Sequence, residues 1–235
     1  MLRYTKYIAK VIYLSVALCA SSLAIAGEQI FTSDENVSKA VTSQFAPLFT
    51  AITQELSENQ GEYLLNPVAY VDFINKRVKS HWDITSTTSA LVGKGQFLAL
   101  RPQDQDRLVA AMDTTLMRYA FEGLEHYSAQ IFDVVSVVIN KQGSLGWVQV
   151  RVRSPILMDL NLDLLIKRSA NNGWKAVDVR FKGITYVAIK KHEYRQMMAQ
   201  DGVEGLIETL QQRNTDFFAD VCAKVSSQSK DTVPC

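Results

Sequence analysis

The residue types that most often carry out chemistry are sparse in this chain of 235 residues. Its three histidines, His81, His126 and His192, are isolated from one another and from any candidate nucleophile. The sequence has no H-E-x-x-H pair for zinc, no G-x-S-x-G nucleophile turn and no P-loop. The motifs therefore do not predict a nucleophilic, zinc-dependent or nucleotide-dependent enzyme, and the histidines are interpreted as surface groups.

One acidic run imitates a metal site. The spacing Asp159-x-Asn161-x-Asp163 is that of the beginning of a calcium-binding loop. Such a loop needs glycine at its sixth position and glutamate at its twelfth, where this chain has Leu164 and Ala170. Polar and apolar residues alternate here, which predicts the solvent face of a β-strand. We expect no metal and no other cofactor.

One pair of residues keeps an acid–base enzyme open as an alternative. Asp178 and Tyr186 could act as the carboxylate and tyrosine of an isomerase or hydratase. Alternation along the predicted strand places Asp178 with Ala176 on the face opposite Val177 and Val179, and we expect that face to meet solvent. An enzyme of this type, and a scaffold that binds another protein through its sheet, are the alternatives to a ligand carrier.

The N-terminus has the pattern of a secretory signal peptide. Residues 1–10 are basic, residues 11–20 are apolar, and Ala24-Ile25-Ala26 offers small side chains at the two positions that signal peptidase reads. The apolar stretch is shorter than the ~20 residues that a membrane-spanning helix needs. We therefore expect residues 1–26 to be removed after Ala26, leaving a soluble, exported protein.

Charge and cysteine content bear on partners and compartment. Lys and Arg number 25 against 24 Asp and Glu, which gives no overall electrostatic reason to bind nucleic acid. Cys222 and Cys235 remain after the leader, and an even number in an oxidising compartment makes them a candidate disulfide worth ~3 kcal/mol. The alternative, a reduced Cys222 in a helix and a Cys235 in a polar tail, is equally open.

Residues 27–235 have the pattern of one domain, with a polar tail from about residue 225. Helical spacing of apolar residues predicts helices over residues 34–57, from Asn66-Pro67, from Pro102, over 192–200 and from Val203. Pro47 should kink or split the first of these helices. Residues 85–100 are ambiguous.

From Ile131 the apolar residues recur at every second position, which predicts β-strands joined by turns. The predicted strands are residues 131–140, 146–154, 158–168, 174–181 and 184–189. One face of such a sheet is apolar, and the amphipathic helices must cover it. The fold class is therefore α+β, a curved antiparallel sheet of about four to five strands covered by N- and C-terminal helices.

From about residue 66 to 213 the chain resembles the MlaC family of periplasmic phospholipid-binding, or toluene-tolerance, proteins. In the C-terminal half the matching residues are Trp174, Asp178, Val179, Gly183, Arg195, Gly202, Leu206, Ile207 and Leu210. Upstream, the matching elements are Trp82-Asp83, Gly93-Lys94, Pro102 with Gln105, and Tyr119-Ala120. The chain departs from the family at Lys182 and Thr185, which stand where the family has Glu and Ser, and it lacks the Trp after Gly-Lys.

The resemblance implies an NTF2-like cone that holds acyl chains between sheet and helices and catalyses no reaction. Family members carry glycerophospholipids between an outer-membrane lipoprotein complex of the MlaA type and an inner-membrane ABC transporter complex of the MlaFEDB type, which maintains outer-membrane lipid asymmetry. Exposing an acyl chain to water costs ~0.8 kcal/mol per CH₂, so such a carrier needs a dry apolar cavity.

The apolar sheet face and the long helix supply the candidate cavity lining. Its residues are Met112, Leu116, Tyr119, Val148, Val150, Leu160, Leu162, Leu164, Val177, Val179 and Phe181. The basic cluster Lys190-Lys191-His192 is interpreted as a solvated helix start, with contact to a lipid phosphate as the alternative.

Overall fold

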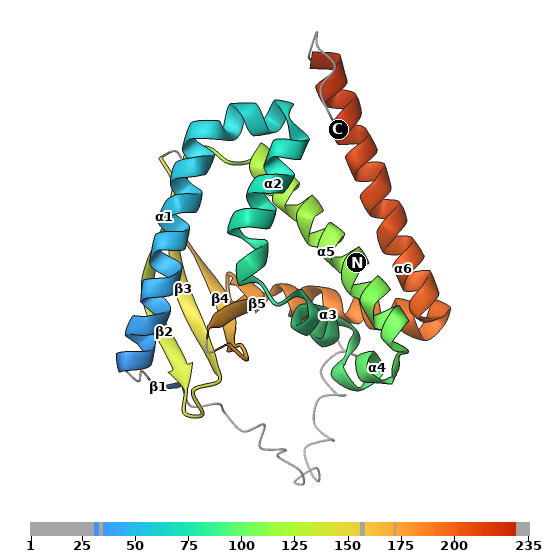
Figure 1. Cartoon of the computed structure of the whole chain (residues 1–235), viewed down its shortest axis with the longest axis horizontal. Coiled ribbons are helices and arrows are strands. Elements are labelled where there is room, and N and C mark those ends of the chain that lie inside the picture. Colours follow the sequence, from blue (N-terminus) through green and yellow to red (C-terminus); the bar gives the residue numbers. More distant parts are fainter. Residues whose placement is uncertain (1–30, 33–34, 156–157, 172, 229–235) are drawn as a thin grey trace, which may run out of the picture.

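The computed structural model describes residues 31–32, 35–155, 158–171 and 173–228 (Figure 1). The predicted signal peptide and Cys235 lie outside these ranges, so cleavage after Ala26 stays a prediction. None of the helices in the described ranges is long and apolar enough to cross a membrane.

The first two helices form an antiparallel pair beside the sheet (Figure 1). Helix α1 (Glu35–Leu65) continues through Pro47, so of the two predicted effects, a kink or a split, the split is wrong. Proline removes one helical hydrogen bond, but Phe45 and Phe49 on either side of it are buried and hold the helix against the sheet. Helix α2 (Pro67–Arg77) begins as predicted, with the Asn66 side chain accepting a hydrogen bond from the Ala69 N–H at 3.2 Å.

Three further helices follow the short 3₁₀ helix η1 (Lys79–His81). They are α3 (Ile84–Val92), α4 (Lys94–Ala99) and α5 (Pro102–Glu125), so the ambiguous segment is helical. Asp83 caps α3 by accepting a hydrogen bond from the Ser86 N–H at 2.9 Å. Gly93 joins α3 to α4 with φ +100°, a conformation that favours glycine.

The sheet is a meander in which every strand pairs antiparallel with the next. Its long strands are β2 (Ile131–Asn140), β3 (Leu145–Arg153), β4 (Leu160–Arg168) and β5 (Trp174–Phe181), and β1 (Phe31–Thr32) and β6 (Ile184–Thr185) are short. The predicted α+β class and antiparallel sheet are confirmed.

The predicted strand over residues 184–189 is wrong beyond Thr185. Helix α6 (Tyr186–Gln228) begins there because side chains satisfy its first N–H groups. The Asp178 carboxylate accepts from the Val187 N–H at 3.2 Å, and the Thr185 hydroxyl accepts from the Ala188 N–H at 3.1 Å.

Helix α6 contains a kink at Gly202, whose φ of +69° requires a residue without a side chain. The segment before the kink runs near α3, and the long segment after it runs beside α5 (Figure 1). Val225 near its end is buried, so the helix continues into the region predicted as a polar tail.

Candidate functional site

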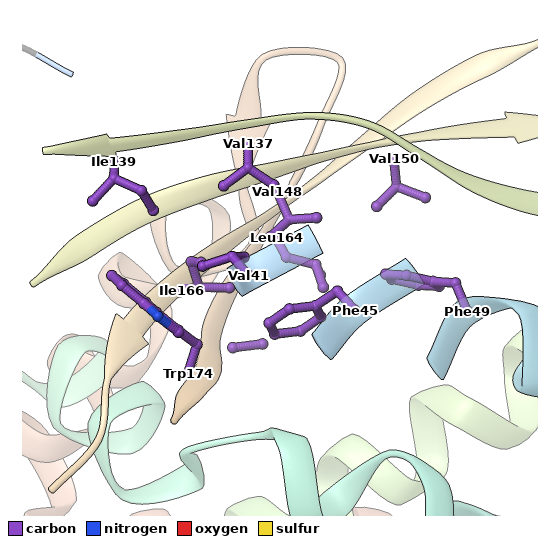
Figure 2. Close-up of a cluster of buried hydrophobic side chains, with 11 residues drawn as sticks. Val41, Phe45, Phe49, Val137, Ile139, Val148, Val150, Leu164, Ile166 and Trp174 are labelled. Atoms are coloured by element: carbon purple, nitrogen blue, oxygen red, sulfur yellow. The ribbon is translucent and has the colours of Figure 1, made fainter. Parts of the chain in front are cut away.

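The inner face of the sheet is solidly packed at one end, which we call the closed end. Ile139, Ile166 and Ala176 are aligned across the strands there and are almost inaccessible to solvent. Phe45 and Trp174 close over them (Figure 2). Gly146 completes this row. A Cβ atom at that position would come within 2.4 Å of Ile139 Cδ1, so the close packing requires glycine there. The closed end is a hydrophobic core.

The other end of the same face, which we call the open end, is only partly covered. Leu160, Leu162 and Val179 are half-buried, and Phe181 is 42% exposed. Leu162 lies between Val150 on β3 and Phe181 on β5 in the strand register. An apolar face that the protein leaves accessible is typical of a binding surface.

A groove between the helices, which we call the helix groove, provides a second apolar surface. Its volume is about 280 Å³, and it lies between α2, η1, α3 and α5. The apolar lining consists of Ile74, Val78, Trp82, Ile84, Leu116, Met117, Tyr119 and Ala120. The charged side chains that line it, Lys79 and Asp113, form an ion pair with each other. The groove is therefore suited to a hydrocarbon chain.

Trp82 connects the helix groove to the sheet. It lines the groove and also packs against the apolar cluster on the inner face of the sheet. Its indole N–H donates to the Thr87 hydroxyl at 2.9 Å, and that hydroxyl donates to the Val177 carbonyl at 2.7 Å. These bonds fix the indole in place. Sequence analysis identified Trp82 only as part of a family motif and missed this role.

The predicted lining residues separate into groups. Leu116 and Tyr119 line the helix groove. The open end contains Leu160, Leu162, Val179 and Phe181, and the sheet core contains Val148, Val150 and Leu164. Met112 is buried in another place, a cluster between α3, α5 and α6. Helical spacing shows which residues of α5 are apolar, but it does not show that Met112 faces α3 and α6 while Leu116 and Tyr119 face the groove.

Val177 lies on the other face of the sheet, so its predicted position is wrong. Strand β5 contains an extra residue, since Ile166 pairs with Ala176 but Leu165 pairs with Asp178. The bulge shifts the alternation, so Ala176 points into the core and Val177 lines a hollow beneath α3 and α4.

The Asp178 carboxylate, considered above as an acid–base group, holds backbone in place. Asp178 is buried rather than solvent-facing, and its Oδ1 accepts hydrogen bonds from the Val179 and Val187 N–H groups at 2.8 and 3.2 Å. Asp163, from the run that imitates a calcium loop, pairs with Arg180 at 2.8 Å. Both acids thus have structural partners.

Cys222 lies on α6 and takes part in a disulfide, whereas Cys235 is outside the described residues. The pairing of Cys222 with Cys235 therefore stays a prediction.

The MlaC protein family model matches residues 48–212, more than half of the chain. A solved structure, the phospholipid-binding protein from Ralstonia solanacearum in complex with a phospholipid, superposes with a TM-score of 0.63 at 18% identity. The superposition covers 77% of this chain and 98% of that one, which shows a shared fold. None of the curated proteins matches this chain. On the family match, the chain belongs to the MlaC family.

Proposed function

We propose that this protein is a periplasmic carrier of glycerophospholipids. The observations that carry the proposal are two apolar surfaces that stay accessible, the open end of the sheet and the helix groove, together with Trp82, which lines the groove and packs against the apolar cluster of the sheet. The family match and the phospholipid bound by the Ralstonia protein of the same fold support it.

The size of the groove indicates how a lipid would use these two surfaces. The helix groove, at about 280 Å³, is at the lower limit of small-molecule pockets, ~300–1,000 Å³. A whole phospholipid therefore needs the open end as well as the groove. Since each CH₂ gains ~0.8 kcal/mol on leaving water, acyl chains supply most of the binding free energy.

The proposed partners are an outer-membrane lipoprotein complex of the MlaA type and an inner-membrane ABC transporter complex of the MlaFEDB type. A carrier with no energy source of its own can only exchange lipid, so direction has to come from such partners. This role requires export after cleavage at Ala26 and binding without catalysis.

Native mass spectrometry of protein purified without detergent tests the proposal. We expect a mass above that of the mature polypeptide, with the difference identified as phospholipid after solvent extraction. The same preparation measured under denaturing conditions gives the polypeptide mass and so also checks cleavage after Ala26. Bare polypeptide from several gentle preparations would contradict a lipid carrier.

A further inference from the structure

A polar cluster lies where α5 meets the beginning of α6. The Tyr186 and Tyr194 hydroxyl oxygens are 3.3 Å apart, and the Tyr119 ring makes an edge contact with Tyr186 at 5.8 Å between centroids. The Arg118 guanidinium carbon lies 4.9 Å from the centre of the Tyr119 ring. We call these four residues the Arg118–tyrosine cluster.

Arg118 brings more hydrogen-bond donors than its surroundings use. Its side chain is only 16% exposed, and within the described ranges its Nε is a fully buried side-chain atom without a hydrogen-bond partner. The ion pair with Glu122 is long, at 3.8 Å, and the Glu122 side chain is 44% exposed. A guanidinium has five donors, and a buried donor without an acceptor costs free energy, so this position favours an anion.

The tyrosines add further donors. The hydroxyls of Tyr119, Tyr186 and Tyr194 interact with one another, and each carries a hydrogen that a phosphate oxygen can accept in place of such a bond. Burial raises the pKa of Tyr194 to about 12 and raises the pKa of Tyr186 further, so both stay protonated at physiological pH.

The ion pairs of and beside the cluster contain one more basic than acidic side chain. Glu193 pairs with both Lys190 and Arg213 at 2.9 Å. Together with Arg118 and Glu122 this makes three basic side chains against two acidic ones. Phosphate is attracted to such a site because charge-assisted hydrogen bonds to guanidinium are among the strongest in proteins.

The cluster adjoins both apolar surfaces. Tyr119 lines the helix groove. Tyr186 follows directly after β6, whose Ile184 pairs with Phe181 of the open end. An amphiphile with its chains in the groove and open end would thus have its polar group near Arg118.

We propose that Arg118, assisted by the hydroxyls of Tyr119 and Tyr186, binds the phosphate group of the lipid. The proposal rests on the proposed function and makes it specific, since it requires a phosphate and not only acyl chains. The same chemistry would suit free inorganic phosphate, so the experiment must separate the two sources.

Lipid competition tests the proposal. Lipid-stripped protein is incubated with vesicles containing equal amounts of dioleoylphosphatidylglycerol and dioleoylglycerol, which share acyl chains but differ in the phosphate. We expect the wild type to take up the phospholipid about tenfold in preference, and Arg118→Gln to lose that preference with dioleoylglycerol uptake unchanged. The control Arg107→Gln, on the same helix in an exposed pair with Glu204, should keep it.

The outcomes are distinguishable. Uptake of neither lipid by the wild type would contradict the proposed function, whereas equal uptake of both, or an unchanged preference in Arg118→Gln, would overturn the phosphate site alone. If Arg118→Gln does not fold, Tyr186→Phe is used instead, because it removes only one hydroxyl. We then expect a two- to threefold loss of the preference for phospholipid, and an unchanged preference would overturn the phosphate site. Calorimetric titration with inorganic phosphate covers the second source: Arg118-dependent binding without a phospholipid preference would overturn the lipid assignment.

Discussion

The closed and open ends of the sheet are built from the same kinds of residue on the same strands, yet one is core and the other is accessible. Ile166 and Leu162 lie four residues apart on β4 and on the same face of the sheet, but Ile166 is fully buried and Leu162 is not. The difference comes from the covering helices. Helix α1 packs along β2, while α5 packs mainly against α6 (Figure 1). Alternation creates an apolar face, and helix placement decides whether it becomes core or binding surface.

The largest expected contrast between the two ends is in stability. Phe45→Ala at the closed end should lower the free energy of unfolding by about 3–5 kcal/mol, because a side chain that is 1% exposed leaves a cavity. The matched change Phe181→Ala at the open end should cost less than about 1 kcal/mol. Urea unfolding of lipid-stripped protein measures both, and equal losses would show that the two ends do not differ.

A tryptophan introduced at each end should affect different properties: stability at the closed end and lipid content at the open end. Ile166→Trp overpacks the closed end and should cost about 1–3 kcal/mol. Leu162→Trp, four residues earlier on the same strand, should unfold nearly normally but retain less phospholipid, because the indole takes the place of the lipid.

Thermal unfolding of stripped protein and lipid extraction are the two measurements, since bound lipid itself raises apparent stability. A large stability loss in Leu162→Trp with normal lipid content would place Leu162 in solid core.

Sequence periodicity was sufficient for the elements whose signals are local. The period of two located β2 to β5, and Asn66-Pro67 located the start of α2. The pattern failed where distant residues decide. Tyr186 begins a helix because Asp178, on another strand, accepts a hydrogen bond from the first turn.

The site was only partly predictable for the same reason. Leu162 and Phe181 are partners in the strand register, so they share a face as the alternation predicts, but one bulge residue reversed Val177 and Ala176. Periodicity within one strand does not predict a bulge, because a bulge depends on the register between two strands. Trp82 was missed because Thr87, which accepts from its indole N–H, is held in turn by the Val177 carbonyl of the sheet, 90 residues later in the chain.

A smaller effect is expected at the junction between the two surfaces. Thr87→Val removes the acceptor of the Trp82 indole N–H and the donor to the Val177 carbonyl, and should cost about 1–2 kcal/mol. The neighbouring Thr88→Val is the control, because among the described residues the Thr88 hydroxyl bonds only within its own helix, to the Ile84 carbonyl. Thermal unfolding should show the larger loss for Thr87→Val, with reduced lipid retention. Equal losses would mean that Trp82 does not depend on Thr87.

The smallest expected effect is a pH dependence confined to the closed end, where the His81 ring lies 6.4 Å from the Phe45 ring. Burial, and then the positive charge of Lys175, lower the pKa of His81 below its ordinary value of 6.5. The unfolded chain therefore binds this proton more readily than the folded one. Stability should accordingly be complete above pH 6.5 and decline as the pH falls from there through the lowered folded pKa.

The decline attributable to His81 should be less than about 1 kcal/mol, because the ring is not fully removed from water. Urea unfolding of stripped protein at a series of pH values, compared with His81→Gln, isolates it. The variant should lose the decline in stability just below pH 6.5. It should keep the decline at more acidic pH, because Glu193 becomes protonated there and loses its ion pairs. The partners Arg213 and Lys190 lower the pKa of Glu193. Identical slopes in the two proteins just below pH 6.5 would show that His81 at the closed end does not sense pH.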